Sequence, residues 1–270
     1  MQKILVLDYG GQYNQLIARR VRENNVYCEI YSYKTDLSVI KAKNPKGIIF
    51  TGGPNSVFDM SSTHYDPVVL ELGIPVLGIC YGMQLMMHLL GGQCRKAITR
   101  EYGKTELTVC TDSPLFADIP EKAVYWMSHG VEVESAAPGF TAIASSEGCR
   151  HAAVECAGKK LYGVQFHPEV AHTEYCSTLF NNFVHGICGC KGDWSMDSLA
   201  DELIEEVRAQ VGSCRVVAGL SGGVDSSVAA TLVHRAIGDK LTCIFVDHGL
   251  LRKNEAEEVM SYYRNEIGLN

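Results

Sequence analysis

The sequence lacks any long apolar run, any excess of positive charge and any disulfide framework. No stretch approaches the ~18 apolar residues of a membrane span, and a strand is expected almost directly after Met1, so we predict neither a span nor a signal peptide. The net charge of -7 provides no basic face for nucleic acid. We therefore expect a cytoplasmic protein whose partners include neither membranes nor nucleic acid.

The sequence also has no second cysteine or histidine pair at zinc spacing near its one close pair of cysteines. Its eleven cysteines are scattered and odd in number, which favours reduced thiols over disulfides. The one close pair, Cys188 and Cys190, is interpreted as structural because no second pair lies nearby. What the chain does have is 270 residues, 46% of them hydrophobic, enough for one large domain or two ordinary ones.

One cysteine stands at an abrupt change of hydrophobic period. Residues 74–79 (IPVLGI) form an apolar run typical of a strand buried on both faces, and apolar residues from Met83 onward follow helical spacing. Cys80 lies between them, flanked by Gly78 and Gly82. This pattern predicts a nucleophile elbow, in which the helix N-terminus favours the thiolate. The alternative is a small buried core cysteine, which the paired glycines disfavour.

The first part of the chain alternates strands with helices. Strands are expected at 3–8, 26–33 and 46–51, with helical stretches after the first two. This order predicts βαβ units in an α/β fold with a doubly wound, mostly parallel sheet, whose ligands gather at the carboxyl ends of the strands. Gly52 and Gly53 end the third strand, where glycine lets a backbone N–H approach a reacting oxygen.

Short β runs broken by Pro and Gly follow, and they predict a mixed extension of the sheet. The runs are 105–110, 123–127, 141–145, 152–155 and 160–166. Ser128, His129 and Gly130 are expected in a polar loop after the second run, where a lone histidine is usually structural. The last run leads to His167-Pro168-Glu169. Proline favours an extended residue before it, so His167 and Glu169 are expected side by side, a carboxylate orienting an imidazole.

Cys80, His167 and Glu169, with Gly52-Gly53 ahead of them, resemble the class I glutamine amidotransferases over roughly the first 190 residues. The resemblance implies a flavodoxin-like fold and a triad that hydrolyses glutamine to glutamate and ammonia. It makes Cys80 the nucleophile, His167 the base and Glu169 its partner. It further implies an oxyanion site at the backbone N–H groups of Gly53 and Tyr81, and glutamine-binding positions at Gln84, Ser128, His129 and Gly130. One departure is Val131, where the family often has Asp.

A second strand, turn and helix follows a boundary near Lys191. A helix is expected at 195–211 and a strand at 215–220, and a glycine- and hydroxyl-rich loop then opens another helix. No Gly-Lys-Ser/Thr follows, so the loop is not a Walker motif. It resembles the loop of the ATP pyrophosphatases, which implies ATP binding through Ser221, Gly222, Gly223, Val224, Asp225, Ser226 and Ser227. Asp225 is implied as a neighbour of Mg²⁺.

The two motifs in one chain, followed by residues 245–255 (FVDHGLLRKNE), resemble the family of glutamine-hydrolysing GMP synthases. That resemblance implies amination of xanthosine monophosphate (XMP) by glutamine, ATP and Mg²⁺, with a homodimer for the full-length enzyme. It divides the chain into an amidotransferase domain at 1–190 and a truncated start of an adenine nucleotide alpha-hydrolase-like domain at 191–270. We therefore expect this chain to release ammonia without completing GMP synthesis. His248 stands where an Asn is expected.

Two other functions remain open at this stage. The chain could be a glutaminase subunit that feeds a separate synthetase, although a pure glutaminase has no use for the Ser221 loop. It could also be a glutamine or nucleotide sensor without catalysis, although a sensor needs no complete triad. Ammonia release with and without Cys80 separates the two enzymes from the sensor.

Overall fold

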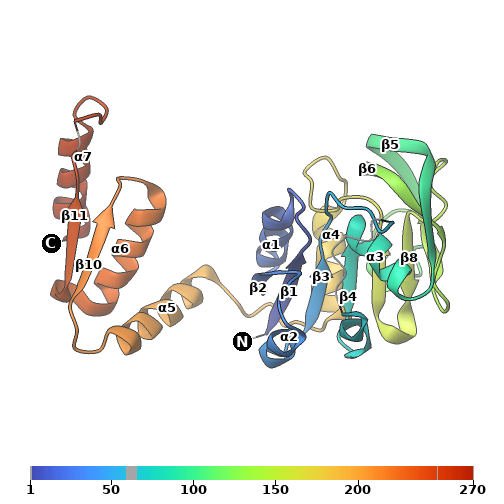
Figure 1. The fold of residues 1–270 in the computed structure, drawn as a ribbon, viewed down its shortest axis with the longest axis horizontal. Helices are drawn as coiled ribbons and strands as arrows, with labels where there is room; N and C mark the ends of the chain where they lie inside the picture. Colours follow the sequence, from blue (N-terminus) through green and yellow to red (C-terminus); the bar gives the residue numbers. More distant parts are fainter. Residues whose placement is uncertain (1, 59–65, 248, 270) are drawn as a thin grey trace. The chain divides into compact units, whose positions relative to one another are not determined.

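The computed structural model describes residues 2–58, 66–247 and 249–269, so His248 lies outside the described residues. The chain divides into two compact units, 1–194 and 195–270, whose elements are labelled in Figure 1. The domains predicted from the sequence, 1–190 and 191–270, remain a prediction, because compactness does not by itself assign a function to each part. Each unit is described separately below.

The first unit is built on strands β1 (Lys3–Asp8), β2 (Tyr27–Ser32), β3 (Gly47–Phe50), β4 (Val76–Ile79), β5 (Gln93–Val109), β6 (Lys122–Ser135), β7 (Thr141–Ser145), β8 (Ala153–Cys156) and β9 (Leu161–Val164). Its helices are α1 (Asn14–Glu23), α2 (Leu37–Lys43), α3 (Tyr81–Leu89) and α4 (Cys176–Asn181), the last continuing as a π-helical segment, Asn182–Ile187. Short 3₁₀ segments occupy Pro67–Glu71, Pro114–Phe116 and Ala157–Lys159.

The strands form one mixed sheet in the order β2-β1-β3-β4-β9-β8-β7-β5-β6. The first five are parallel, and the last four pair antiparallel. The parallel part has the flavodoxin-like order, with β9 in fifth place. This confirms the predicted doubly wound sheet and its mixed extension.

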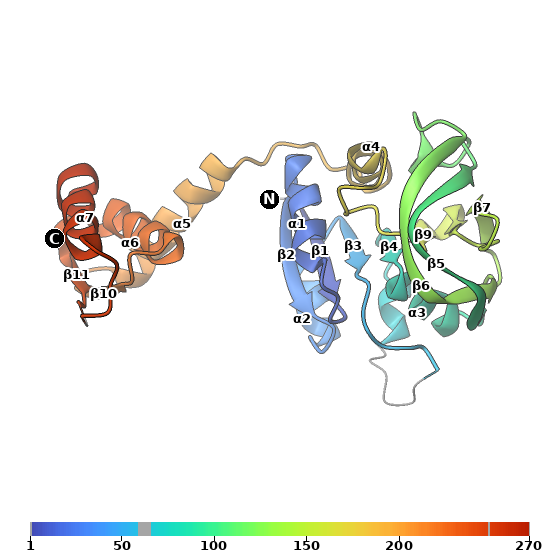
Figure 2. The same ribbon diagram turned by 90° about the horizontal axis from the view of Figure 1, so that it is seen from above.

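Helices cover both faces of the parallel strands. Ile17 and Val21 of α1 pack with Phe180 of α4 in one hydrophobic core, whereas Ile40 of α2 and Met83 of α3 belong to a second core. Figure 2 shows α4 and α3 on opposite sides of the strands. Strands β3, β4 and β9 are buried along their whole length, which explains why their sequences are continuously apolar rather than alternating.

Two local expectations were wrong. β5 and β6 are much longer than the predicted runs and pair as one hairpin, so Ser128, His129 and Gly130 lie inside strand β6 rather than in a loop. In addition, the segment after His167 is not extended. It turns, with the N–H of Val170 donating to the carbonyl of His167 at 3.4 Å, and this turn brings Glu169 beside the imidazole.

The second unit contains α5 (Met196–Val211), β10 (Val216–Leu220), α6 (Val224–Ile237), a 3₁₀ segment (Gly238–Lys240), β11 (Leu241–Phe245), α7 (Glu255–Ser261) and a π-helical segment (Tyr262–Ile267). β10 and β11 pair in parallel as a two-stranded sheet. A small core that includes Leu220, Leu241 and Tyr263 lies on one of its faces. Val217 and Ile244, which point to the other face, are 67% and 51% exposed.

The helices among the described residues are all too short or too polar to cross a membrane.

Candidate active site

Cys80 occupies a strained turn between β4 and α3. Its φ of 51° and ψ of −107° are unusual for a residue other than glycine. A Cβ on Gly78 would lie 2.7 Å from the backbone of Gly82, and one on Gly82 would lie 2.5 Å from the carbonyl oxygen of Phe50. Strand and helix therefore approach each other at a distance that only two glycines allow. This is the elbow geometry that the spacing of the sequence predicts.

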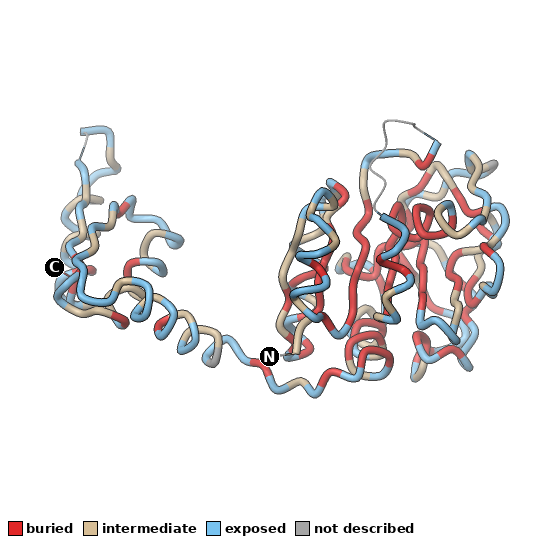
Figure 3. The backbone as a smooth tube through the Cα atoms, turned by 60° about the horizontal axis from the view of Figure 1, so that its bottom comes forward, coloured by how far each residue is buried: buried red, intermediate tan, exposed pale blue. Residues whose placement is uncertain are grey.

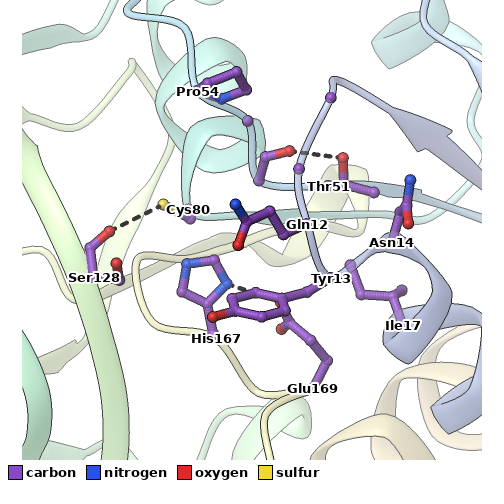
Figure 4. Close-up of a pocket in the computed structure, with 14 residues that line it drawn as sticks. Gln12, Tyr13, Asn14, Ile17, Thr51, Pro54, Cys80, Ser128, His167 and Glu169 are labelled. Atoms are coloured by element: carbon purple, nitrogen blue, oxygen red, sulfur yellow. Dashed lines mark hydrogen bonds and ion pairs between the residues drawn. The ribbon is translucent and has the colours of Figure 1, made fainter.

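The thiol of Cys80 faces a pocket of about 440 Å³ at the carboxyl ends of the parallel strands. The pocket is formed after β1 by Gly10 to Asn14, after β3 by Thr51 to Pro54, and after β9 by His167 and Glu169 (Figure 4). Ile17 and Ser128 complete its lining. Its size is in the range of small-molecule sites.

His167 and Glu169 form a buried pair beside this thiol. Nδ1 of the imidazole lies 2.8 Å from Oε1 of Glu169, and the two residues are 7% and 1% exposed. Burial lowers the pKa of His167, but its hydrogen bonds to Cys80 and Glu169 outweigh this and raise the pKa to about 10. The site therefore favours an imidazolium in contact with the nucleophile.

Further contacts fix the position of His167. Its backbone N–H donates to the carbonyl of Trp126 at 2.9 Å, and its own carbonyl accepts from Oγ1 of Thr173 at 2.8 Å. The ring of Tyr13 meets the imidazole edge-on, with 5.4 Å between ring centroids. The backbone of His167 is thus held by β6 and by Thr173, and its imidazole is held by Tyr13 from the loop after β1.

The predicted oxyanion positions lie near the thiol. Gly53 lines the pocket, and a Cβ there would be 2.7 Å from the carbonyl oxygen of Tyr9. Gly52 lies against both catalytic candidates, because a Cβ there would be 3.2 Å from Cε1 of His167 and 3.7 Å from Cβ of Cys80. Tyr81 is the first residue of α3, so its backbone N–H belongs to the helix N-terminus, where an anion is favoured.

Of the four predicted glutamine-binding residues, only Ser128 is among the described residues that line the pocket. Its carbonyl lies 3.9 Å from Sγ of Cys80. The side chain of His129 instead contacts Glu101, with Nε2 and Oε2 separated by 3.1 Å. Gln84 is 4% exposed, and its amide is hydrogen-bonded inside the protein.

The sequence interpretation missed two groups of site residues. The loop from Gly10 to Asn14 follows a parallel strand and so ends at the same sheet edge as Cys80, a signal that was present in the sequence. Gln165, fully buried, donates from Nε2 to Sγ of Cys80 at 3.7 Å. No local pattern marks this glutamine, because its partner is 85 positions away.

The loop from Ser221 to Ser227 is shaped by its own hydroxyl groups. The backbone N–H of Gly223 donates to Oγ of Ser221 at 3.3 Å, and Oγ of Ser226 donates to the carbonyl of Gly223 at 3.1 Å. Gly222 has a φ of +77°, which glycine adopts without strain. Gly223 precedes the first residue of α6, and the first five residues of the loop are exposed. Asp225 is in the first turn of that helix.

The fold and the cysteine elbow define a class of protein that comparison with known sequences identifies directly. Residues 5–187 match the sequence model of the class-I glutamine amidotransferase family, and the chain belongs to that family. Residues 196–263 are similar to the NAD synthase family.

Whole-chain relatives are more specific. The chain is 58% identical over 265 residues to a protein of Lachnospira eligens named glutamine-hydrolyzing GMP synthase, a match that covers 98% of this chain and 51% of that protein. A protein of the same name from Enterococcus faecalis is 54% identical over 270 residues, with 100% and 52% covered. The chain thus spans about half the length of the curated relatives it matches.

Solved structures agree with the fold. A protein of Thermoplasma acidophilum described as a GMP synthase subunit is 29% identical, with a TM-score of 0.60 over 70% of this chain and 94% of that one. A glutamine amidotransferase of Thermotoga maritima is 18% identical, with a TM-score of 0.53 over 76% of this chain and 85% of that one. The second likeness supports the fold alone.

Proposed function

We propose that the first unit hydrolyses the side-chain amide of glutamine to glutamate and ammonia. The observation that carries this proposal is the placement of Cys80, at a strained elbow, beside the buried His167–Glu169 pair in one pocket. A thiol, a base and an orienting carboxylate are the parts that acyl transfer through a cysteine needs.

In the first step, the proton of the Cys80 thiol goes to His167, and the sulfur attacks the amide carbon of glutamine. The negative charge that develops on the amide oxygen is met by the backbone N–H groups of Gly53 and Tyr81. His167 then gives its proton to the leaving nitrogen, so that ammonia departs and a thioester with Cys80 remains. Glu169, 2.8 Å from the imidazole, orients the ring and stabilises its cationic form.

In the second step, water attacks the thioester carbon, and His167 takes its proton as a general base. The tetrahedral intermediate collapses to glutamate, and His167 returns its proton to the departing sulfur, which restores the Cys80 thiol. Ser128 is the glutamine-binding candidate whose position is most direct, since it lines the same pocket. Gln84, His129 and Gly130 are proposed to affect glutamine binding indirectly. Gln84 and His129 would do so through the Val131 carbonyl of β6, and Gly130 through its place in the same strand.

In the longer protein, the ammonia would aminate XMP to GMP after activation by ATP. The names of the relatives support this part, as does the similarity of residues 196–263 to NAD synthase. The loop from Ser221 to Ser227 would receive ATP phosphates, because it presents hydroxyls and a helix N-terminus. Residues 191–270 would then be the first part of the nucleotide-binding domain. Cytoplasmic location and a homodimeric full-length enzyme remain predictions.

One carboxylate next to the proposed phosphate site fits a magnesium ion. Asp225 is exposed in the first turn of α6, next to the proposed phosphate site. Mg²⁺ is commonly held by one or two carboxylates together with substrate phosphates. Asp225 is therefore proposed to hold Mg²⁺, which when bound would neutralise the phosphate charge of ATP.

A separate glutaminase subunit is the second candidate function. The similarity to the Thermoplasma acidophilum protein described as a subunit, 94% of which is covered, favours it. The second unit, with its serine- and glycine-rich loop at the start of α6, favours the fused enzyme instead. A non-catalytic sensor is disfavoured by the buried His167–Glu169 pair, since binding alone needs no base.

The test is ammonia release from glutamine by the wild-type chain and by Cys80→Ala, with Cys110→Ala as the control because Cys110 is an exposed thiol. We expect Cys80→Ala to lose activity by on the order of 10⁶-fold, the loss known for removal of a serine nucleophile, and Cys110→Ala to keep it. A glutamine-analogue electrophile should label Cys80 alone among the eleven cysteines. Equal ammonia release from Cys80→Ala and wild type would contradict the proposal and leave the sensor.

ATP-dependent formation of GMP from XMP by the full-length protein, absent in a variant with Ser221 and Asp225 replaced by Ala, separates the fused enzyme from the subunit.

A further inference from the structure

The side-chain amide of Gln165 lies against the sulfur of Cys80. The residue follows β9 directly and is fully buried, and its backbone N–H donates to the carbonyl of Ala152 at 2.8 Å. Its Nε2 is 3.7 Å from Sγ of Cys80. The steps proposed above assign this group no role, although it is a polar group in contact with the reacting atom.

The direction of the Gln165 amide is fixed by its neighbours. An amide oxygen and nitrogen look alike, so their assignment has to come from their partners. The carbonyl of Val131 can only accept a hydrogen bond, so the group of Gln84 that lies 2.9 Å from it is the NH₂. The same nitrogen is 3.1 Å from the Gln165 amide, which must present its oxygen there. Gln165 therefore turns its own NH₂ toward Cys80.

The anchoring carbonyl of Val131 also lies next to the His129 ring. Nδ1 of His129 lies 3.2 Å from it, and Nε2 of the same ring lies 3.1 Å from Oε2 of Glu101. Glu101 accepts a further hydrogen bond from Oγ of Ser146 at 2.7 Å. The contribution of Val131 comes from its backbone carbonyl.

We propose that Gln165 is a catalytic residue of the glutaminase, whose amide N–H donates to the sulfur of Cys80 and stabilises its thiolate, and that Gln84 is a positioning residue acting through Gln165. This rests on the proposed glutaminase function. The thiol proton still goes to His167, and Gln165 transfers none. Both hydrogens of the Gln84 NH₂ are used by Val131 and Gln165, so this NH₂ is not available to glutamine.

The test measures the thiolate without substrate. The rate of alkylation of Cys80 by iodoacetamide is followed against pH, by mass spectrometry of the peptide that contains it, in the wild type, Gln165→Met and Gln84→Met. Methionine keeps the length of the side chain and removes the donor. Because hydrogen bonds to charged groups are the stronger ones, we expect the midpoint to rise by about one pH unit in Gln165→Met, a tenfold change in thiolate. A smaller rise in the same direction is expected in Gln84→Met. Ammonia release should fall about tenfold in Gln165→Met at pH values below the wild-type midpoint, where the thiolate is the minor form.

Gln210→Met, on the exposed surface of α5, is the matched control and should leave the midpoint unchanged. An unchanged midpoint in folded Gln165→Met would overturn the proposal. Gln84→Met leaves Gln165 in place and tests it independently: an unchanged midpoint with a raised KM for glutamine would make Gln84 a substrate contact and overturn its positioning role. Loss of glutaminase in Cys80→Ala together with unshifted midpoints would refute this inference while the proposed function stands.

Discussion

The two units differ in how far the faces of their parallel strands are covered. In the first unit, β3, β4 and β9 are buried at every residue, because helices cover both faces of the sheet. In the second, β10 and β11 alternate between inward residues and exposed ones such as Val217 and Ile244. Figure 3 shows the contrast within each unit: red along the strands of the first, mainly tan and pale blue in the second.

This difference bears on how each candidate site is held. The Cys80 pocket is bounded by the ends of four parallel strands and backed by two cores, so its side chains are held by packing on several sides. The Ser221 loop is shaped mainly by hydrogen bonds among its own residues, on a sheet with one covered face. The first site is thus supported by the fold around it, whereas the second is supported by local contacts. Four measurements test this difference between the units.

The largest effect is expected from replacing His167 of the first unit by alanine, with His234 of the second unit as the control. His167→Ala should lower ammonia release by roughly 10²–10⁴-fold, because general acid–base assistance is lost, and Glu169→Ala should lower it less, since the carboxylate only orients the ring. His234→Ala in α6 should leave the rate unchanged. Small and equal losses in the two triad variants would mean that the His167–Glu169 pair is structural.

A methyl group at the elbow should destabilise the first unit. Gly82→Ala places a Cβ 2.5 Å from the carbonyl oxygen of Phe50, and we expect about 3 kcal/mol of destabilisation from this overpacking. The two tryptophans, Trp126 and Trp194, both lie in the first unit, so urea unfolding followed by their fluorescence reports on it alone. Gly186→Ala, where a Cβ would meet nothing within 4 Å, is the control and should be neutral or slightly stabilising.

The stability of the first unit should depend on pH through His167. Folding raises the pKa of this residue from its ordinary value of about 6.5 to about 10. The folded state binds the proton more tightly, so the stabilisation is complete below pH 6.5 and is lost as pH rises toward 10. Tryptophan-detected unfolding between pH 7 and 9 should show a fall of up to about 1 kcal/mol per unit, and less in so far as the proton on His167 comes from the Cys80 thiol, because that transfer leaves the number of bound protons unchanged. A wild-type slope no steeper than that of His167→Gln would contradict the expectation.

The smallest effect should come from the open face of the second unit. Val76→Ala in β4, fully buried, should cost about 2 kcal/mol of stability by tryptophan fluorescence. Val217→Ala in β10, 67% exposed, should change stability by less than about 0.5 kcal/mol by hydrogen exchange of the second unit. A loss at Val217 as large as that at Val76 would show that this face is covered in solution and would remove the contrast.

The sequence predicted the parts of the fold that depend on local pattern. The elbow followed from Gly78 and Gly82 and the change of period at Cys80, and the parallel sheet followed from the alternation of strands and helices. The β5–β6 hairpin was underestimated, because its length depends on pairing between residues far apart, such as Lys104 with Trp126. The exposed face of β10 was not predicted from local pattern either. Val216, Val217 and Ala218 are all apolar, so their sequence shows no alternation that would mark one face as exposed.

The candidate site was predicted unevenly for the same reason. Cys80, His167 and Glu169 are marked by motifs within a few residues, and the structure brings them to one pocket, while their catalytic roles remain proposals. His129 carries a polar side chain in a motif but turns it to Glu101, because strand periodicity sends it away from the side that Ser128 occupies. Gln165 depends on Gln84, 81 positions away, and no local pattern encodes such a contact.

The close backbone packing at Gly78, which meets Gly82, and at Gly82, which meets Phe50, has a consequence for sequence drift. A larger residue at most packed positions can be accommodated when a neighbour becomes smaller. Here the neighbour in the way is the backbone of the other glycine or of Phe50, which no substitution can shrink. A lineage that keeps Cys80 in this turn therefore has no second-site route to replacing either glycine. The two positions can change only together with the loss of the nucleophile's geometry, so the elbow is expected to persist or to disappear as a unit.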